Sequence, residues 1–256
     1  MDIISKRRLL SKVPEVTAIF WITKVLTTGM GETTSDYLAH RFEPIIVVVI
    51  AGLALFAVLG LQFYVRKYIP WVYWLAVMMV SVFGTMAADV LHIGLGVPYI
   101  VSTVFFAVTL AVIFAVWYIR EKTLSIHSIH TFKREFFYWA TVLTTFALGT
   151  AAGDMTATTM GLGYFASGVL FAVVIAMPMI GYWRFRLNTI FAFWCAYIVT
   201  RPLGASFADW MGVSHIRGGL DYGTGLVSLV LLLFIMGCVG YLTVTHEDVE
   251  KANKST

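Results

Sequence analysis

Four short segments of this chain place an aspartate at the same distance from a tryptophan and a glycine. Each has the spacing W-x9-G-x4-D, and the glycines stand 53, 65 and 55 residues apart. A carboxylate can bind a cation or carry a proton, and an ionisable group inside an apolar segment usually marks an ion or proton path. The four sets are Trp21, Gly31 and Asp36; Trp74, Gly84 and Asp89; Trp139, Gly149 and Asp154; and Trp194, Gly204 and Asp209.

The elements that carry these segments are predicted to be membrane-spanning helices. The chain has 256 residues, of which 59% are hydrophobic and 12% charged, whereas a soluble domain carries about 25% charged residues. A helix needs about 20 apolar residues to cross the hydrocarbon core of a bilayer. The sequence therefore predicts an all-α polytopic membrane protein with eight spans, near residues 14–36, 45–65, 70–91, 97–119, 135–158, 162–183, 190–211 and 222–245.

The basic residues predict the orientation of these spans. Fourteen of the 18 Lys and Arg residues fall in the tails and in alternate connections, and the opposite connections hold only Arg41 and Arg217. Because connections rich in Lys and Arg remain in the cytoplasm, we expect both termini there. The predicted cytoplasmic segments are the tails 1–12 and 246–256 and the loop 120–134.

The repeat unit is a hairpin of two spans, and four hairpins make up one membrane domain over residues 1–256. The predicted repeats cover 12–67, 68–122, 133–186 and 188–246. A two-span unit returns to its starting side, so successive copies are parallel and related by an axis along the membrane normal. The first helices of the four hairpins then bring four carboxylates to one height.

Each part of the motif has a physical interpretation. The tryptophans Trp21, Trp74, Trp139 and Trp194 are expected at the cytoplasmic interface, where aromatic rings favour the headgroup level. The glycines Gly31, Gly84, Gly149 and Gly204, with Gly153 four residues after Gly149, are expected to let helix backbones approach closely. Each aspartate lies 15 residues after its tryptophan, or about 22 Å along a helix, in the outer part of the span. A carboxyl group that simply contacts interfacial water is the alternative for any one of them.

The first and fourth copies depart from the pattern. The first adds Lys24 and Glu32, and the fourth has Arg201 and Pro202 just before Gly204. The spacing predicts an ion pair between Arg201 and Glu32, acting as a clasp that closes the ring or as a gate. Pro202 is expected to break its helix, which is tolerated where protein or water satisfies the freed groups. Lys24 is expected to neutralise a site carboxylate or to extend toward the interface.

Histidines and cysteines are weaker candidates. His127 and His130 lie in a predicted cytoplasmic loop, where a solvated loop is favoured over a shared metal. Cys195 and Cys238 lie in apolar segments and are expected to be core residues.

The sequence also resembles a known family. Lys12 to Thr17, Phe20-Trp21, Lys24 and the stretch from Gly31 to Asp36 resemble bacterial inner-membrane proteins built of four tandem repeats of unknown function. The resemblance implies two transmembrane segments and a tryptophan in each repeat, an eight-helix fold and a bacterial inner (plasma) membrane. It implies no reaction.

The sequence favours membrane transport of a cation, and a small divalent metal such as Mn²⁺ or Mg²⁺ suits carboxylate ligands best. No motif of an enzyme or of nucleotide binding is present, so we expect no catalysis and no cofactor beyond a bound divalent cation as substrate. The expected partners are the lipid bilayer and the cation, without nucleic acid. One alternative is a proton-coupled transporter of a small organic cation or metabolite, and another is a membrane sensor or assembly protein. The predicted cation ligands are Glu32, Asp36, Asp89, Asp154 and Asp209.

Overall fold

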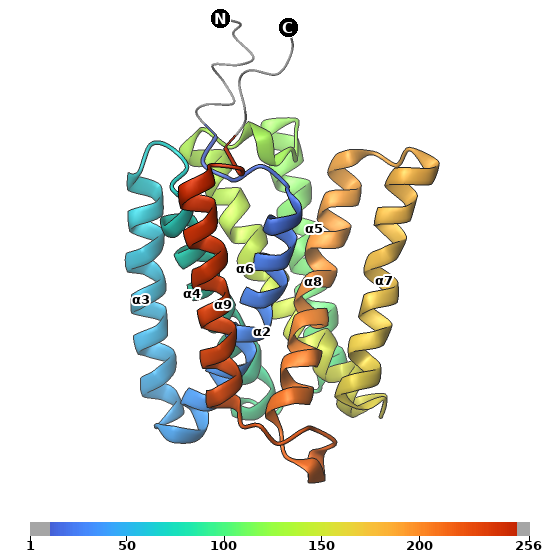
Figure 1. Ribbon diagram of the computed structural model, residues 1–256. Helices are drawn as coiled ribbons and strands as arrows, with labels where there is room; N and C mark the ends of the chain where they lie inside the picture. The colour runs from blue at the N-terminus through green and yellow to red at the C-terminus, as the bar shows by residue number, and fades with distance from the viewer. Residues whose placement is uncertain (1–10, 250–256) are drawn as a thin grey trace, which may run out of the picture.

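Eight long α-helices with short connections make up the part of the chain that the computed structural model describes, residues 11–249 (Figure 1). Residues 1–10 and 250–256, which hold most of the two predicted tails, lie outside the described residues. The prediction of an all-α architecture is confirmed. The helices are α2 (Ala18–Arg41), α3 (Pro44–Tyr64), α4 (Pro70–Asp89), α5 (Tyr99–Glu121), α6 (Phe132–Asp154), α7 (Gly163–Phe185), α8 (Thr189–Gly212) and α9 (Thr224–Thr245).

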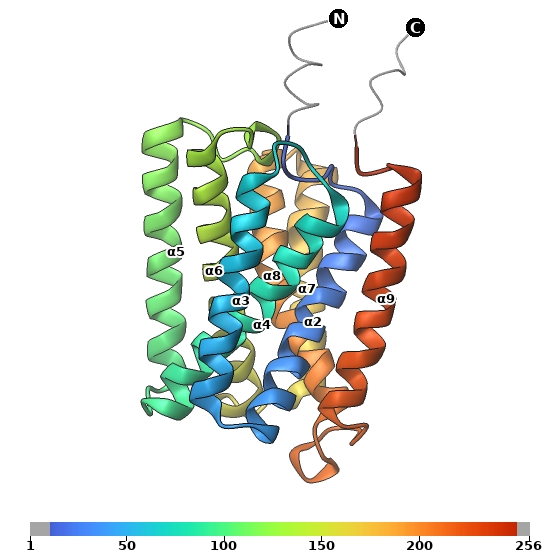
Figure 2. The ribbon, with the colours of Figure 1, turned by 90° about the vertical axis from the view of Figure 1, so that its left-hand side faces the viewer.

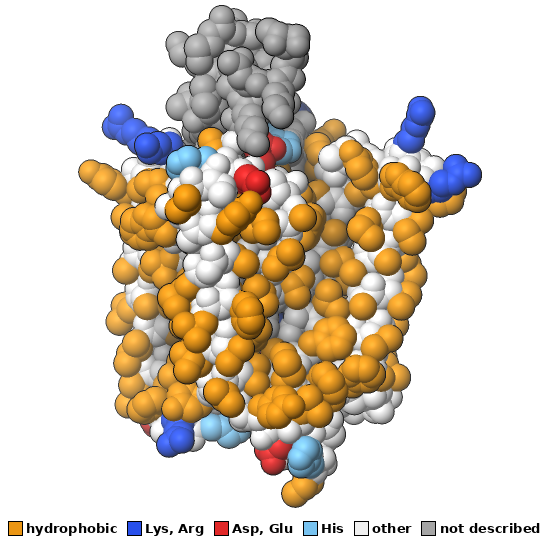
Figure 3. Space-filling view, in the orientation of Figure 1, with side chains coloured by type: hydrophobic (Ala, Val, Ile, Leu, Met, Phe, Trp, Pro, Cys, Tyr) orange, Lys and Arg blue, Asp and Glu red, His pale blue; other side chains and the backbone are white. Residues whose placement is uncertain are grey.

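Seven of the eight helices are long and apolar enough to cross a membrane. The exception, α2, carries Lys24, Glu32, Asp36 and Arg41 within its 24 residues, and its polar side chains are largely enclosed by other helices. On the face seen in Figure 3, hydrophobic side chains predominate between the two ends of the bundle, and the charged side chains gather at those ends. The protein is therefore a multi-pass membrane protein in contact with lipid.

The first helices of the four hairpins form an inner ring. Helix α2 packs against α4 and α8, and α6 packs against the same two helices, so the ring is closed. Of the most apolar stretch in each span, 56% is buried in α4, 61% in α6 and 50% in α8, but only 22% in α3 and 17% in each of α5, α7 and α9. Polar side chains of the inner helices are consequently shielded from lipid.

The second helices of the hairpins stand outside this ring (Figure 2). Each packs chiefly against the inner helix that follows it in the chain: α3 on α4, α5 on α6 and α7 on α8. The last, α9, packs chiefly on α2 and so closes the series. Every inner helix is thereby covered by the outer helix of the preceding repeat.

The two ends of the bundle differ in charge. One end, called here the terminal end, holds Ser11, Val249 and the connections 65–69, 122–131 and 186–188. The opposite or distal end holds the connections 42–43, 95–98, 160–162 and 213–223. Lys and Arg side chains project mainly from the terminal end (Figure 3).

The motif glycines lie where neighbouring inner helices touch. A methyl group on any of them would overlap a residue of the next inner helix, and in each case that residue stands three positions before the next motif glycine. The predicted role in close packing is confirmed for these four positions. The contacts are Gly31 with Ser81, Gly84 with Phe146, Gly149 with Arg201 and Gly204 with Thr28.

Helix α8 continues as a single helix through Pro202, so the prediction of a broken helix is wrong. Pro202 packs on α6, where an added Cβ on Gly149 would lie 2.9 Å from the proline Cδ. Pro202 has no N–H to donate, so one backbone hydrogen bond of the helix is missing at this position. At Gly153 an added Cβ would stand 3.8 Å from Pro202, an ordinary contact distance, so Gly153 is not required for close approach.

Candidate functional site

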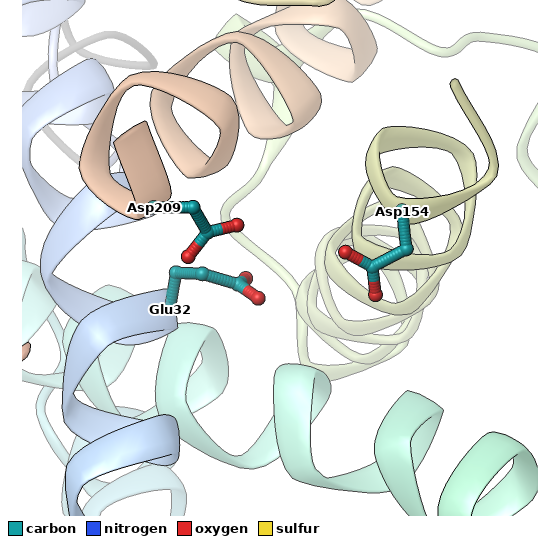
Figure 4. Close-up of side chains that lie close together, drawn as sticks. All are labelled: Glu32, Asp154 and Asp209. Atoms are coloured by element: carbon teal, nitrogen blue, oxygen red, sulfur yellow. The ribbon is translucent and has the colours of Figure 1, made fainter. Parts of the chain in front are cut away.

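Three carboxylates from three different repeats meet near the distal end of the inner ring. Glu32 of α2, Asp154 of α6 and Asp209 of α8 each place an oxygen within 4.8 Å of the other two. Figure 4 shows their side chains pointing toward a common space. Glu32 is 4% exposed and Asp209 is 5% exposed, and Asp154 is half-buried. The three ligand-type oxygens therefore converge in a largely enclosed position.

The other two predicted ligands are Asp89 and Asp36. Asp89 and Asp154 are the last residues of α4 and α6, and one π-helical turn follows each, Val90–Gly94 and Met155–Thr159. The Asp89 carboxylate accepts a hydrogen bond from the Ser35 hydroxyl at 3.4 Å. Asp36 is half-buried on α2. Neither residue belongs to the group of three carboxylates.

A single arginine connects the inner helices at the next level toward the terminal end. Arg201, which is fully buried, forms an ion pair with Glu32 and donates a hydrogen bond to Thr85. It also donates to the Thr150 hydroxyl at 2.6 Å and to the Thr28 carbonyl at 3.2 Å. The ion pair that the spacing predicted is thus present, and it joins the first and fourth repeats.

The two threonines were missed by the sequence analysis, although the repeat contains a signal for them. Thr85 and Thr150 each follow a motif glycine directly, as Glu32 does. The fourth residue at this position is Ala205, on the helix that carries Arg201 itself. The guanidinium therefore binds the polar residue at this position in each of the other three repeats.

The charge balance of the site leaves it short of positive charge. Of the three carboxylates only Glu32 pairs with the guanidinium, so the fully ionised group would carry two formal negative charges in a largely buried space. Oxygen Oδ1 of Asp209 is buried and has no hydrogen-bond partner among the described residues. A buried carboxylate oxygen is costly without a partner. This arrangement of hard oxygen ligands suits a divalent cation.

Lys24 lies elsewhere. Its Nζ atom stands 3.9 Å from the centre of the Phe146 ring and 4.2 Å from that of Tyr197. The residue is 1% exposed, and Nζ has no hydrogen-bond partner among the described residues. The amine neither pairs with a site carboxylate nor extends to the interface, so both sequence-based expectations for it are wrong.

Residues 19–68, 72–123, 137–188 and 192–248 each match the family described as Repeat of Unknown Function (DUF347). The chain belongs to this family. The prediction of four tandem repeats is confirmed, and each DUF347 repeat contains one inner and one outer helix. No curated protein and no solved structure was found to match the chain.

In each DUF347 repeat an aromatic residue stands directly before the motif tryptophan, and the four aromatic pairs form one layer inside the bundle. The expectation that the tryptophans contact headgroups is wrong for three of them, since Trp74, Trp139 and Trp194 are 0%, 3% and 4% exposed. The inner helices stand close enough at this level for the rings to pack on one another. The closed series of ring contacts is Phe20 with Trp74 at 5.7 Å, Tyr73 with Trp139 at 5.6 Å, Tyr138 with Trp194 at 6.2 Å, and Trp21 with Phe193 at 5.7 Å.

The segment before α2 covers the terminal end beyond this aromatic layer. The buried Lys12 forms an ion pair with Glu135 and donates to the backbone carbonyls of Gln62 and Phe63 at 3.3 and 3.2 Å. Its own N–H donates to the carbonyl of Ile129 at 3.0 Å. Sequence analysis missed this pair because its members are far apart in the chain and neither belongs to the repeated motif.

Proposed function

We propose that the protein moves a cation across a lipid bilayer through the site formed by Glu32, Asp154 and Asp209. The convergence of these three carboxylates against one guanidinium carries the proposal. A bound divalent cation would neutralise the remaining two formal charges. Neutralising these charges matters because an uncompensated charge in a low-dielectric interior costs much free energy.

A small hard cation such as Mn²⁺ or Mg²⁺ is the proposed substrate. Carboxylate oxygens are the ligands these ions prefer, whereas softer metals favour thiolate or imidazole. The two cysteines, Cys195 and Cys238, are half-buried and do not belong to the group. Asp89 and Asp36, which follow motif glycines at the same spacing, would supply further carboxylates along the path at the distal end.

The proposed topology has eight spans, with α2 enclosed among the others. The cyclic contacts of the motif glycines and of the outer helices support four repeats arranged around an axis along the membrane normal. The excess of Lys and Arg at the terminal end supports a cytoplasmic location for both termini in a bacterial inner membrane. Arg201 lies between the carboxylates and the aromatic layer, so passage of a cation would require both to rearrange.

The alternative of an organic-cation transporter is less well supported by the contacts. An aromatic box for such a substrate would use the motif aromatics, which pack on one another. They stand 15 residues from the aspartates, or about 22 Å along the helices. The rings and the carboxylates therefore do not form a common site.

The test compares two aspartates of the distal end in the full-length protein. Asp209→Asn removes a site carboxylate, whereas Asp221→Asn changes an exposed aspartate in the connection 213–223. Asp221 has φ 60°, a conformation that asparagine tolerates well, so the control is matched in size and in backbone preference. Binding of Mn²⁺ is measured by calorimetry on the purified protein, and flux with a metal-sensitive dye in proteoliposomes.

We expect Asp209→Asn to weaken Mn²⁺ binding at least about tenfold, the loss of one charge-assisted contact of about 1.5–3 kcal/mol. Flux should fall with it, and Asp221→Asn should match the wild type. Equal binding and flux for wild type and Asp209→Asn would refute the proposed site. A wild-type protein that neither binds nor transports Mn²⁺ or Mg²⁺ would refute the proposed substrate.

A further inference from the structure

Comparison of equivalent positions in the four repeats indicates which side chains the fold itself requires. The residue three positions after the motif tryptophan is Lys24, Val77, Val142 or Tyr197 in the four repeats. Val77 and Val142 are both fully buried in the aromatic layer, so an apolar side chain satisfies the packing at this position. The amine of Lys24 is therefore not a requirement of the scaffold.

The residue before the motif tryptophan varies in the same way. It is phenylalanine in the first and fourth repeats, Phe20 and Phe193, and tyrosine in the second and third, Tyr73 and Tyr138. A phenyl ring thus satisfies this position as well. The two hydroxyl groups that the scaffold does not require meet in a buried hydrogen bond, with the two oxygens 2.5 Å apart.

Lys24 has a defined set of polar and charged neighbours. From α8, the centre of the Tyr197 ring lies 4.2 Å from the Lys24 amine, and the Lys24 amine and the Arg201 guanidinium both pack on the ring of Phe146, at 3.9 and 5.6 Å from its centre. Tyr138 of α6 and Tyr73 of α4 lie in the adjoining aromatic layer. On its own helix the nearest acid is Glu32, two turns away and paired with Arg201.

A series of tyrosines leads from this layer to the terminal end. The Tyr73 ring contacts that of Tyr68, with centres 5.6 Å apart. Tyr68 in turn donates its hydroxyl proton to the carboxylate of Asp248, which adjoins the end of α9. Hydroxyl groups can pass a proton along by accepting one and donating another, so Tyr138 and Tyr73 can carry a proton between them, whereas Tyr73 and Tyr68 are joined by a ring contact alone.

We propose that Lys24 is a proton-binding site inside the bundle and that its charge opposes cation binding at the carboxylates. Its Nζ atom has no hydrogen-bond partner among the described residues, so a proton would pass to the hydroxyls of Tyr138 and Tyr73, and from them to the terminal end, when the lysine side chain moves toward them. In each exchange the ammonium loses one proton and becomes an amine. Each tyrosine accepts one proton and releases one, so one proton in all reaches the terminal end. The opposition between the two charges rests on the proposed function, whereas the proton site itself does not.

The opposition follows from electrostatics and linkage. Like charges repel strongly across an apolar layer such as Phe146, because little solvent screens them. If a proton on Lys24 weakens cation binding, a bound cation must favour release of that proton by the same factor. Couplings of this kind commonly change an affinity by about 5- to 150-fold. The result is an exchange of cation for proton without a shared ligand.

The first experiment requires no metal. Tryptophan fluorescence of the purified full-length protein is titrated against pH, because Trp74 and Trp194 lie in the layer around the amine. We compare the wild type with Lys24→Val, which introduces the residue of the second and third repeats, and with Lys24→Met, which keeps the chain length. Lys133→Val, at an exposed position, is the control. The wild type and the control should share a transition that both Lys24 variants lack, and the same titration in all four proteins would overturn the proton site.

The second experiment measures proton release when Mn²⁺ binds, by calorimetry in buffers of different ionisation enthalpy. Near the midpoint of the first titration, the wild type should release more protons than either Lys24 variant, and its Mn²⁺ affinity should rise with pH at least about fivefold more steeply. Equal release would overturn the coupling. If neither the wild type nor the Lys24 variants bind Mn²⁺ but the fluorescence transition still depends on Lys24, the cation proposal fails and the proton site stands.

The third experiment tests the route. Tyr138→Phe should slow the fluorescence response to a pH jump at least tenfold without moving its midpoint. Tyr182→Phe, at an exposed position on α7, removes the same hydroxyl group outside the layer and should leave the rate unchanged. A wild-type rate in Tyr138→Phe would overturn the hydroxyl route.

Discussion

Replacing Arg201 should destabilise the protein mainly by leaving Glu32 buried and unpaired. The guanidinium is fully buried and binds Glu32, Thr85, Thr150 and the carbonyl of Thr28. Removing one partner of a buried ion pair costs about 3–5 kcal/mol. For a chain of this size, about 2–4 °C in Tm corresponds to each kcal/mol. We therefore expect Arg201→Met to lower Tm by roughly 6–20 °C.

The double variant separates the unpaired charge from the lost contacts. Adding Glu32→Gln to Arg201→Met returns the site to the same formal charge as the wild type and removes the unpaired carboxylate. The loss that remains is that of the hydrogen bonds from the guanidinium to Thr85, Thr150 and the Thr28 carbonyl. The double variant should therefore recover part of the lost stability, although it carries one more substitution.

The assay is thermal unfolding of the purified protein in one detergent, with Arg184→Met as an exposed control that should leave Tm unchanged. A double-mutant cycle gives the coupling between Arg201 and Glu32. The reasoning is refuted if Arg201→Met unfolds at the wild-type temperature, or if the double variant is no more stable than the single one.

Two further predictions concern packing and pH. Gly149→Ala should destabilise the protein, because its methyl group would overlap Arg201, whereas Gly153→Ala, with ordinary space at its Cβ, should not; equal melting temperatures would contradict this. At the terminal end, burial raises the pKa of Asp248, so the folded state holds this proton more tightly than the unfolded state does. Its stabilising contribution is complete below the unfolded pKa of about 3.9 and is lost as pH rises through the higher folded value. Unfolding measured against pH should therefore show a loss of stability in that window that is absent in Asp248→Asn.

Much of the fold could be predicted because its signals are local or periodic. The apolar runs predicted all eight helices, and the motif spacing predicted the repeats, the contacts of the four motif glycines and the pairing of Arg201 with Glu32. The close contact at Gly149 but not at Gly153 depends on which face of α6 meets α8, and a shared small-residue spacing does not determine that face. The sequence likewise does not determine whether a helix breaks at a proline or continues through it, as α8 does at Pro202.

The predictions that were wrong or missed share a physical cause. A tryptophan near the end of a span suits the headgroup level, and a position inside the bundle suits it equally when neighbouring helices supply other rings. Sequence alone does not show how closely those helices approach. The same applies to Lys24, whose aromatic neighbours Phe146 and Tyr197 come from two other helices, and to Lys12 and Glu135, which are paired across 123 residues.

The position of Arg201 explains why the four similar repeats are not identical. The equivalent residues in the other repeats are Thr28, Ser81 and Phe146, all smaller or uncharged. Each of these positions packs against a motif glycine of the neighbouring helix, so four arginines would crowd four cations into the space that one guanidinium occupies. One arginine instead takes its acceptors from the other three repeats, and one of those acceptors must be an acid to balance it. The two departures from the repeat pattern, Glu32 and Arg201, therefore depend on each other, because each balances the charge of the other.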